Sequence, residues 1–266
     1  MEYQDIIYDV SHAPIGRLTL NRPDRLNAYT SQMCREILDT LDRYGRDDSC
    51  RVLVLTGAGR GFCSGGDVRS TDEVEEAAGR QLGQGMIMRE SMHAVNLALH
   101  RLDKPVIAMI NGPAVAGGLT LALLCDLRIA AASARLGDTS SVAGLLPDEG
   151  GAWVFPRAVG LEAALRMTWL HEVYGAEEAQ RLGLVGEVVP DDELEARVLQ
   201  VATAIAAGPP LAIRLAKRMM RRAQELTFEQ ALGDAELAVH FLNATADVQE
   251  GVAAFIERRP AVFEGR

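Results

Sequence analysis

Two adjacent carboxylates, Asp148 and Glu149, stand between a proline and a pair of glycines in the segment LLPDEGGAW, residues 145–153. The flanking residues are apolar, so a carboxylate there is costly to keep charged and its pKa should rise. Such a carboxyl group can act as a general base or a general acid. Pro-Asp and Gly-Gly are also ordinary turn residues, so this segment alone indicates either a turn or an acid/base centre.

The segment TGAGRGFCSGGD, residues 56–67, follows a predicted strand and contains several glycines. It lacks the glycine spacing of a dinucleotide-binding loop and the GK[ST] of a Walker phosphate loop. A nucleophile elbow around Ser64 also fails, because Phe62 occupies its first glycine position. What remains is a loop with free backbone N–H groups at Gly65 and Gly66.

A similar loop leads to Gly117 and Gly118, where a helix is expected to begin. Backbone N–H groups at a helix N-terminus are unpaired and lie at the positive end of the helix dipole. For either loop alone, a structural glycine is the better interpretation. Two such loops that converge would form an oxyanion hole, which holds a carbonyl oxygen as it becomes an enolate.

Histidine and cysteine patterns give little support to metal or thiol chemistry. His93 and His100, seven residues apart, could share a helix face, but no HExxH or CxxC pattern is present. The sequence therefore predicts no metal site, and we expect the cysteines to be reduced thiols. The remaining histidines and the cysteines are His12, His171, His240, Cys34, Cys50, Cys63 and Cys125.

The composition is that of a globular protein, with 266 residues, 48% of them hydrophobic and 24% charged. A net charge of −10 argues against nucleic-acid or anionic-membrane partners, which require a basic surface. The N-terminal MEYQDIIYDV does not resemble a signal peptide, and the longest apolar run, residues 113–124, is short for a membrane span. We expect a cytoplasmic protein.

Strands and helices alternate to about residue 190, which predicts an α/β core over residues 1–190. Helices alone are predicted over residues 191–266, as a region that packs on the core or on a neighbouring subunit. The predicted strands are residues 6–10, 17–21, 51–57, 105–112 and a run that begins at Cys125. The predicted helices are a segment capped by Thr30 and residues 73–102, 193–207, 211–223 and 228–243.

The order of three motifs, GFCSGGD, PVIAMINGPAVAGGLTLALLCD and GLLPDEGGAWVFPRAVG, resembles the enoyl-CoA hydratase/isomerase (crotonase) superfamily. The resemblance runs from NRPDRLNA at Asn21 to the C-terminal FIERRPAVFEG. It implies a spiral of ββα units and a helical C-terminal region that forms homotrimers or dimers of trimers. It also implies an acyl-CoA substrate and no separate cofactor, because CoA is part of the substrate.

The resemblance assigns the oxyanion-hole amides to Gly66 and Gly117. It places the helical stretch over residues 73–102 at the acyl pocket, and it implies that Asp67 fixes its loop rather than acting as a catalyst. Phe255 and Arg258 are expected to reach the nucleotide of a neighbouring subunit. The other residues implied in CoA contact are Arg25, Leu26, Ser64, Gly65 and Val68, with Arg69 nearby.

This sequence departs from the pattern of the family hydratases at two positions that bear on the reaction. Family hydratases carry glutamates where this chain has Thr120 and Ser140, so water activation by that carboxylate pair is not expected. Family isomerases often place their acid/base at the aspartate of this proline-containing segment, here Asp148. Glu149 is expected to point away and to pair with an arginine such as Arg157, although both acids could face the pocket.

These observations favour an acyl-CoA isomerase, or a related enolate-forming enzyme, with a single aspartate as acid/base. An enoyl-CoA hydratase is the alternative. An acyl-CoA thioester or C–C bond hydrolase, and a non-catalytic acyl-CoA-binding paralogue, remain further alternatives.

Overall fold

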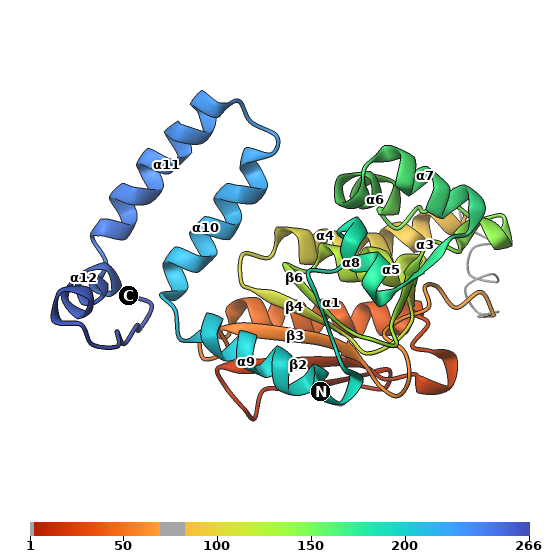
Figure 1. Ribbon diagram of the computed structural model, residues 1–266, viewed down its shortest axis with the longest axis horizontal. Coiled ribbons are helices and arrows are strands. Elements are labelled where there is room, and N and C mark those ends of the chain that lie inside the picture. The colour runs from red at the N-terminus through yellow and green to blue at the C-terminus, as the bar shows by residue number, and fades with distance from the viewer. Residues whose placement is uncertain (1–2, 70–82) are drawn as a thin grey trace.

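The computed structural model describes residues 3–69 and 83–266. Its main sheet has six strands in the order β1-β2-β3-β4-β6-β9 (Figure 1). β1 is antiparallel to β2, and the remaining neighbours pair in parallel. These strands are β1 (Ile6–Asp9), β2 (Ile15–Leu20), β3 (Val52–Gly57), β4 (Val106–Ile110), β6 (Leu127–Ala131) and β9 (Glu187–Val189).

A second, smaller sheet has three strands in the order β5-β7-β8. These are β5 (Ala114–Val115), β7 (Arg135–Gly137) and β8 (Val173–Gly175). β5 follows β4 directly and precedes α5 (Gly117–Leu124), so this short strand carries the chain from the main sheet to the second glycine loop.

The central strands β3 and β4 are buried at every position, as expected for parallel strands covered on both faces. Their side chains alternate between two apolar clusters. Leu53 and Leu55 face the cluster that includes Ile37 of α1 (Ser31–Arg46). Val52 and Val54 face the cluster that includes Val198 of α9 (Leu194–Ala206). α9 thus packs on the main sheet.

Helix boundaries agree with the sequence in some places and differ in others. The Thr30 side chain accepts a hydrogen bond from the backbone N–H of Met33, which confirms the predicted cap of α1. The helix expected over residues 73–102 is divided in the structure into α3 (Gln84–Glu90) and α4 (Met92–Arg101), because Ser91 has a non-helical backbone conformation. Residues 73–82 lie outside the described part of the chain.

Further helices cover the edges of the sheets and end the chain. They are η1 (Pro23–Arg25), η2 (Ser140–Ala143), α6 (Gly151–Val159), α7 (Leu161–Leu170), α8 (Ala176–Leu182), η3 (Asp191–Glu193), α10 (Pro210–Ala223), α11 (Phe228–Asn243) and α12 (Ala246–Glu257).

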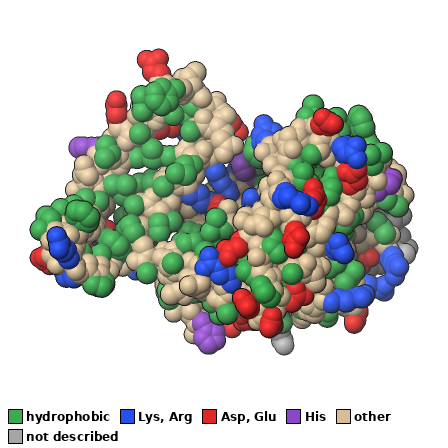
Figure 2. Space-filling view, in the orientation of Figure 1, with side chains coloured by type: hydrophobic (Ala, Val, Ile, Leu, Met, Phe, Trp, Pro, Cys, Tyr) green, Lys and Arg blue, Asp and Glu red, His purple; other side chains and the backbone are tan. Residues whose placement is uncertain are grey.

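The last three helices, α10 to α12, project from the core (Figure 1). Neither α10 nor α11 contains a fully buried residue. Hydrophobic side chains gather along the projecting helices at the left of Figure 2. No single helix of the described chain is long and apolar enough to cross a membrane, although residues 191–206 and 210–223 together, bent by 103°, meet that criterion by length and composition.

Candidate active site

The two glycine loops predicted from the sequence lie together in the structure. Cys63 and Ala114 form a parallel β-bridge, and the backbone N–H of Val115 donates to the Cys63 carbonyl oxygen at 3.0 Å. The approach requires glycine, because a Cβ atom at Gly118 would lie 2.1 Å from that same carbonyl oxygen. Gly65, with a φ of +92°, turns the first loop next to Ala116.

The backbone N–H groups of Gly66 and Gly117 are available to a ligand. Within the described part of the chain, neither donates a hydrogen bond to a protein acceptor. Gly117 is the first residue of α5, where the helix dipole favours negative charge. Ala116 turns the chain into this helix with a left-handed φ of +50°. The loops thus provide two N–H donors of the kind that stabilise an oxyanion.

Tyr29, which the sequence analysis did not select, connects the glycine loops to the acidic segment. Its backbone pairs with Gly66, and its phenol packs against Gly66 and Gly117. A Cβ atom added at Gly66 would lie 3.3 Å from the Tyr29 hydroxyl oxygen, and one added at Gly117 would lie 2.9 Å from it. The same hydroxyl donates a 2.6 Å hydrogen bond to Glu149 Oε1. Burial, with the nearby Glu149, holds the pKa of Tyr29 well above its usual value, so the phenol keeps its proton.

Glu149 is the buried member of the acidic pair, with 8% of its surface exposed. Its Oε1 accepts the hydrogen bond from Tyr29, whereas Oε2 has no hydrogen-bond partner within the described chain. Burial raises the pKa of Glu149 to about 7; the hydrogen bond from Tyr29 lowers it, and the neighbouring Asp148 raises it further. The expected rise in carboxyl pKa is thus confirmed for Glu149.

The expected pairing of Glu149 with Arg157 is wrong, because the Arg157 guanidinium instead lies 4.0 Å from the centre of the Trp153 ring. Of the two arrangements considered for the acids, the structure has the alternative, in which both Asp148 and Glu149 line the cavity. The expected alternation assumed an extended segment, but residues 148–150 form a turn.

α4 fixes the backbone of this turn. His93 Nε2 lies 3.0 Å from the carbonyl oxygen of Asp148, and Asn96 Nδ2 donates to the carbonyl oxygen of Glu149 at 2.6 Å. His93 and Asn96 are three residues apart, so they lie on the same side of the helix. Asn96 was missed because nothing in the sequence shows which loop α4 packs against.

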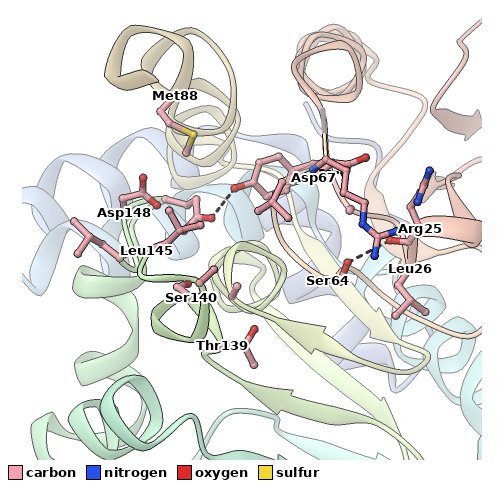
Figure 3. Close-up of a pocket in the computed structure, with 18 of the residues that line it drawn as sticks. Arg25, Leu26, Ser64, Asp67, Met88, Thr139, Ser140, Leu145 and Asp148 are labelled. Carbon is pink, nitrogen blue, oxygen red and sulfur yellow. Dashed lines mark hydrogen bonds between the residues drawn. The ribbon is translucent and has the colours of Figure 1, made fainter. Parts of the chain in front are cut away.

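The acidic turn and the glycine loops border one cavity of about 500 Å³ (Figure 3). Figure 3 shows Asp148, Leu145 and Met88 on one side and the segments around Arg25 and Ser64 on the other. The sequence-predicted residues that line the cavity are Arg25, Leu26, Ser64, Gly66, Asp67, Val68, Arg69, Ser140, Asp148 and Glu149.

Several other predicted residues do not line this cavity in the described chain. Gly65 and Gly117 lie next to the lining residue Ala116. Thr120 lies further along α5. Phe255 and Arg258 belong to the projecting end of the chain, on α12 and directly after it. Their expected contact with a neighbouring subunit therefore stays a prediction.

Asp67 fixes its loop, as the resemblance implied. Its Oδ2 accepts a 2.8 Å hydrogen bond from the Arg22 guanidinium, and its Oδ1 accepts one from the backbone N–H of Arg69 at 3.1 Å. Burial raises the pKa of Asp67, but these hydrogen bonds outweigh it and lower the pKa overall. The Ser64 hydroxyl donates to the Arg25 carbonyl oxygen at 3.3 Å and joins the two segments expected to contact CoA.

Thr120 and Ser140 provide no carboxylate to the cavity. The Thr120 hydroxyl is buried without a hydrogen-bond partner in the described chain. The Ser140 hydroxyl donates to Asp138 Oδ1 at 2.7 Å and is held there. Among the described residues, the acids that line the cavity are Asp24, Asp67, Asp148 and Glu149, and of these Glu149 borders the Gly117 position directly.

Neither the cysteines nor a group of possible metal ligands forms a second candidate site in the described chain. All four cysteines are buried, and none forms a disulfide in the described chain. Among the described residues, no three His, Cys, Asp or Glu side chains are grouped to hold a metal ion.

Comparison with known proteins gives the family. The family model for enoyl-CoA hydratase/isomerase matches residues 11–266. The chain is 36% identical to a 1,2-epoxyphenylacetyl-CoA isomerase from Escherichia coli, over 97% of this chain and 98% of the relative. It is also 36% identical to a probable enoyl-CoA hydratase from Rhodobacter capsulatus, over the full length of both.

The fold agrees with a solved structure. A crystal structure of an enoyl-CoA hydratase from Bacillus anthracis superimposes with a TM-score of 0.90 at 32% identity, covering 99% of this chain and all of the other. The geometry of the site, with converging glycine loops and an acidic turn beside them, thus agrees with the full-length matches to this family. The chain belongs to the enoyl-CoA hydratase/isomerase family and has the crotonase fold.

Proposed function

We propose that the protein isomerises an enoyl-CoA, or a closely related acyl-CoA thioester, through an enolate. One observation carries this proposal. Among the described residues, Asp148 and Glu149 are two acids on a single turn beside the glycine loops, whereas Asp67 is held by Arg22. The positions of the two hydratase glutamates hold the hydroxyl residues Thr120 and Ser140. The site is therefore equipped to move a proton between carbons of a bound thioester.

In the proposed reaction, the thioester carbonyl oxygen accepts hydrogen bonds from the N–H groups of Gly66 and Gly117. These donors stabilise the negative charge that develops on the oxygen, and each is typically worth about 3 kcal/mol. The proton on the adjacent carbon becomes more acidic as a result. Asp148, the exposed acid at the cavity, removes it as a carboxylate, and the proton is returned at another carbon. No redox cofactor takes part, and CoA enters as part of the substrate.

Hydration of an enoyl-CoA is the second candidate, and a specific observation favours it. Two carboxyl groups lie beside the glycine loops, and activation of water requires a base together with an acid. Relatives named as a hydratase and as an isomerase are equally similar to this chain, at 36% identity each.

A panel of purified enoyl-CoA esters, including 3-enoyl and aryl-substituted acyl groups, tests the proposal. After incubation with the protein, product mass and ultraviolet absorbance are measured together. Isomerisation leaves the mass unchanged while the absorbance of the conjugated thioester changes. Hydration adds the mass of one water, thioester hydrolysis releases free CoA, and a non-catalytic binder changes neither quantity. Any of the last three results would replace the proposed reaction.

A further inference from the structure

Asp148 and Glu149 line one cavity, and one buried carboxyl oxygen of Glu149 has no hydrogen-bond donor in the described chain. Glu149 Oε1 is occupied by the Tyr29 hydroxyl, and Oε2 is buried with no hydrogen-bond partner in the described chain. Asp148 is the chain neighbour of Glu149 on the same turn, and both residues line the same cavity. The charge of Asp148 also helps to raise the pKa of Glu149. Two ionised carboxylates have only acceptors, so they cannot hydrogen-bond to each other. One proton between them would supply the missing donor.

The surroundings of the two groups determine which one keeps that proton. Glu149 is buried, and taking an ionised carboxylate out of water is costly, so its neutral form is favoured. Asp148 is exposed at the cavity, where its charge stays solvated. A neutral Glu149 would accept from Tyr29 at Oε1 and donate from Oε2 to Asp148. This arrangement satisfies every carboxyl oxygen of Glu149.

We propose that Asp148 and Glu149 share one proton and work as a pair, in which Asp148 is the base and Glu149 supplies the proton that enters the product. Tyr29 is a positioning residue that fixes Glu149 through Oε1. This inference rests on the proposed isomerisation and extends it from one acid/base to two.

The atoms balance for a 3-enoyl thioester. Asp148 takes a proton from the carbon next to the thioester, and the C–H electron pair enters a dienolate whose oxygen lies at Gly66 and Gly117. The O–H bond of Glu149 then breaks, and its proton bonds to the far carbon of the dienolate. The double bond re-forms in conjugation with the thioester. Asp148 then releases its proton to solvent, and a solvent proton that enters through Asp148 reprotonates Glu149, which restores the pair.

A shared-proton pair and a single carboxylate differ in the origin of the hydrogen that enters the product. With a pair, the hydrogen comes from Glu149, which equilibrates with solvent through Asp148 between turnovers. With a single carboxylate, the removed hydrogen is partly returned to the same molecule. A 3-enoyl-CoA deuterated at the carbon next to the thioester therefore distinguishes the two mechanisms.

The wild-type protein and the Glu149→Gln variant are compared on this substrate in ordinary water. We expect wild-type product to carry almost no deuterium at the far carbon, whereas the slower Glu149→Gln variant returns a measurable share of it. The control Glu162→Gln, a surface acid on α7, should give the wild-type pattern. Equal deuterium retention by wild type and Glu149→Gln would overturn the proposal.

A second measurement needs no turnover. In protein with ¹³C-labelled glutamate carboxyl groups, the Glu149 signal is assigned with Glu149→Gln and titrated in wild type and in Asp148→Asn. We expect the pKa of Glu149 to fall in Asp148→Asn, because the like charge is lost and the asparagine amide can donate to Glu149. An unchanged or higher pKa would show that the two groups do not share a proton. Loss of the isomerase proposal through an inactive substrate panel would leave this titration unaffected.

Discussion

At the residue scale, Asp148 and Glu149 are chain neighbours whose different burial gives them different chemistry. Asp148 is exposed and able to act as a charged base, whereas Glu149 is buried against Tyr29 and Gly117. We therefore expect Asp148→Asn to keep the fold and acyl-CoA binding but to lose turnover by roughly 10²–10⁴-fold, the usual contribution of a general base. Glu149→Gln should have the smaller effect.

Steady-state kinetics of both variants on one turned-over enoyl-CoA, with calorimetry of acyl-CoA binding, check this expectation. Unchanged binding separates a chemical defect from a misfolded cavity. An active Asp148→Asn beside an inactive Glu149→Gln would assign the base to Glu149 instead.

Tyr29→Phe should change the pH dependence of the reaction. The Tyr29 hydroxyl lowers the pKa of Glu149, so its removal raises that pKa above about 7. Glu149 must hold its proton to deliver it, so activity falls as the pH rises through this pKa. The alkaline limb of kcat/KM should therefore move to higher pH in Tyr29→Phe when profiles are recorded from about pH 5 to about 9.

Tyr8→Phe is the matched control, because Tyr8 lies on β1 and does not line the cavity in the described chain. Its profile should overlay that of the wild type. A Tyr29→Phe profile that shifts to lower pH, or not at all, contradicts the positioning of Glu149 by Tyr29.

Stability should also depend on Glu149. Its pKa is raised from 4.5 to about 7 by burial, so the folded protein binds this proton more tightly than the unfolded chain does. The stabilising contribution is complete below about pH 4.5 and is lost as the pH rises through about 7. Glu149→Gln is neutral throughout, so its unfolding free energy relative to wild type should increase from about pH 5 to about 8, by at most about 3 kcal/mol.

Urea unfolding of both proteins at the two pH values measures this difference. A variant that is more stable yet less active would show that the buried acid is kept for chemistry. The same free-energy difference at both pH values would mean that Glu149 titrates normally in the folded protein.

At the element scale, the start of α5 has no room for a side chain. A Cβ atom at Gly117 would lie 2.6 Å from Glu149 Oε1 and 2.8 Å from a Tyr29 ring carbon. Gly117→Ala must displace the acid, the phenol or the N–H donor. We expect kcat/KM to fall by about 100-fold or more, which corresponds to the loss of one oxyanion donor at about 3 kcal/mol.

Gly45→Ala on α1 is a matched control, since its new methyl group would meet only Leu102 at an ordinary 3.6 Å. It should keep wild-type kinetics and gain slightly in stability, because alanine favours a helix interior. If Gly117→Ala stayed folded with kcat/KM within a few-fold of wild type, Gly117 would be structural only.

Features that local chemistry encodes could be predicted from the sequence. The Thr30 cap, the buried strands and the glycines of the two loops all carry short-range signals, and each was found where predicted. The break at Ser91 was not predicted, because the residues around it continue a helical pattern.

Tyr29 could not be predicted from the sequence, because its contact with Glu149 joins positions 120 residues apart. The side-chain partner of Glu149 was predicted incorrectly for a similar reason. Arg157 was chosen as a nearby cation, but the Trp153 ring one helical turn before it holds the guanidinium. Local sequence shows that an acid is present but does not show which long-range neighbour it meets.

At the scale of the whole molecule, the chain exposes more surface than a compact monomer of its mass. Its accessible surface is 14289 Å², whereas a compact 28.7 kDa monomer exposes about 11,300 Å². The helices α10 to α12 project from the core and contribute to this exposed surface (Figure 1). The exposed large hydrophobic residues of α11 are Phe228, Leu232, Leu237, Val239 and Phe241.

This excess area is of the size that permanent subunit interfaces bury. The helices α10 and α11 pack on each other without fully burying any residue, so the pair has little stability of its own. We therefore expect the protein to assemble, with trimers of about 86 kDa, three copies of the 28.7 kDa chain, as the basic unit and dimers of trimers above it.

Light scattering after size-exclusion chromatography at micromolar concentration measures the mass of this assembly. Leu237→Glu on α11, at a residue that is 75% exposed in the single chain, should lower the mass of the assembly, whereas Ile7→Glu on the edge strand β1 should not. A wild-type mass equal to one chain would leave the projecting helices without a partner and would contradict the assembly.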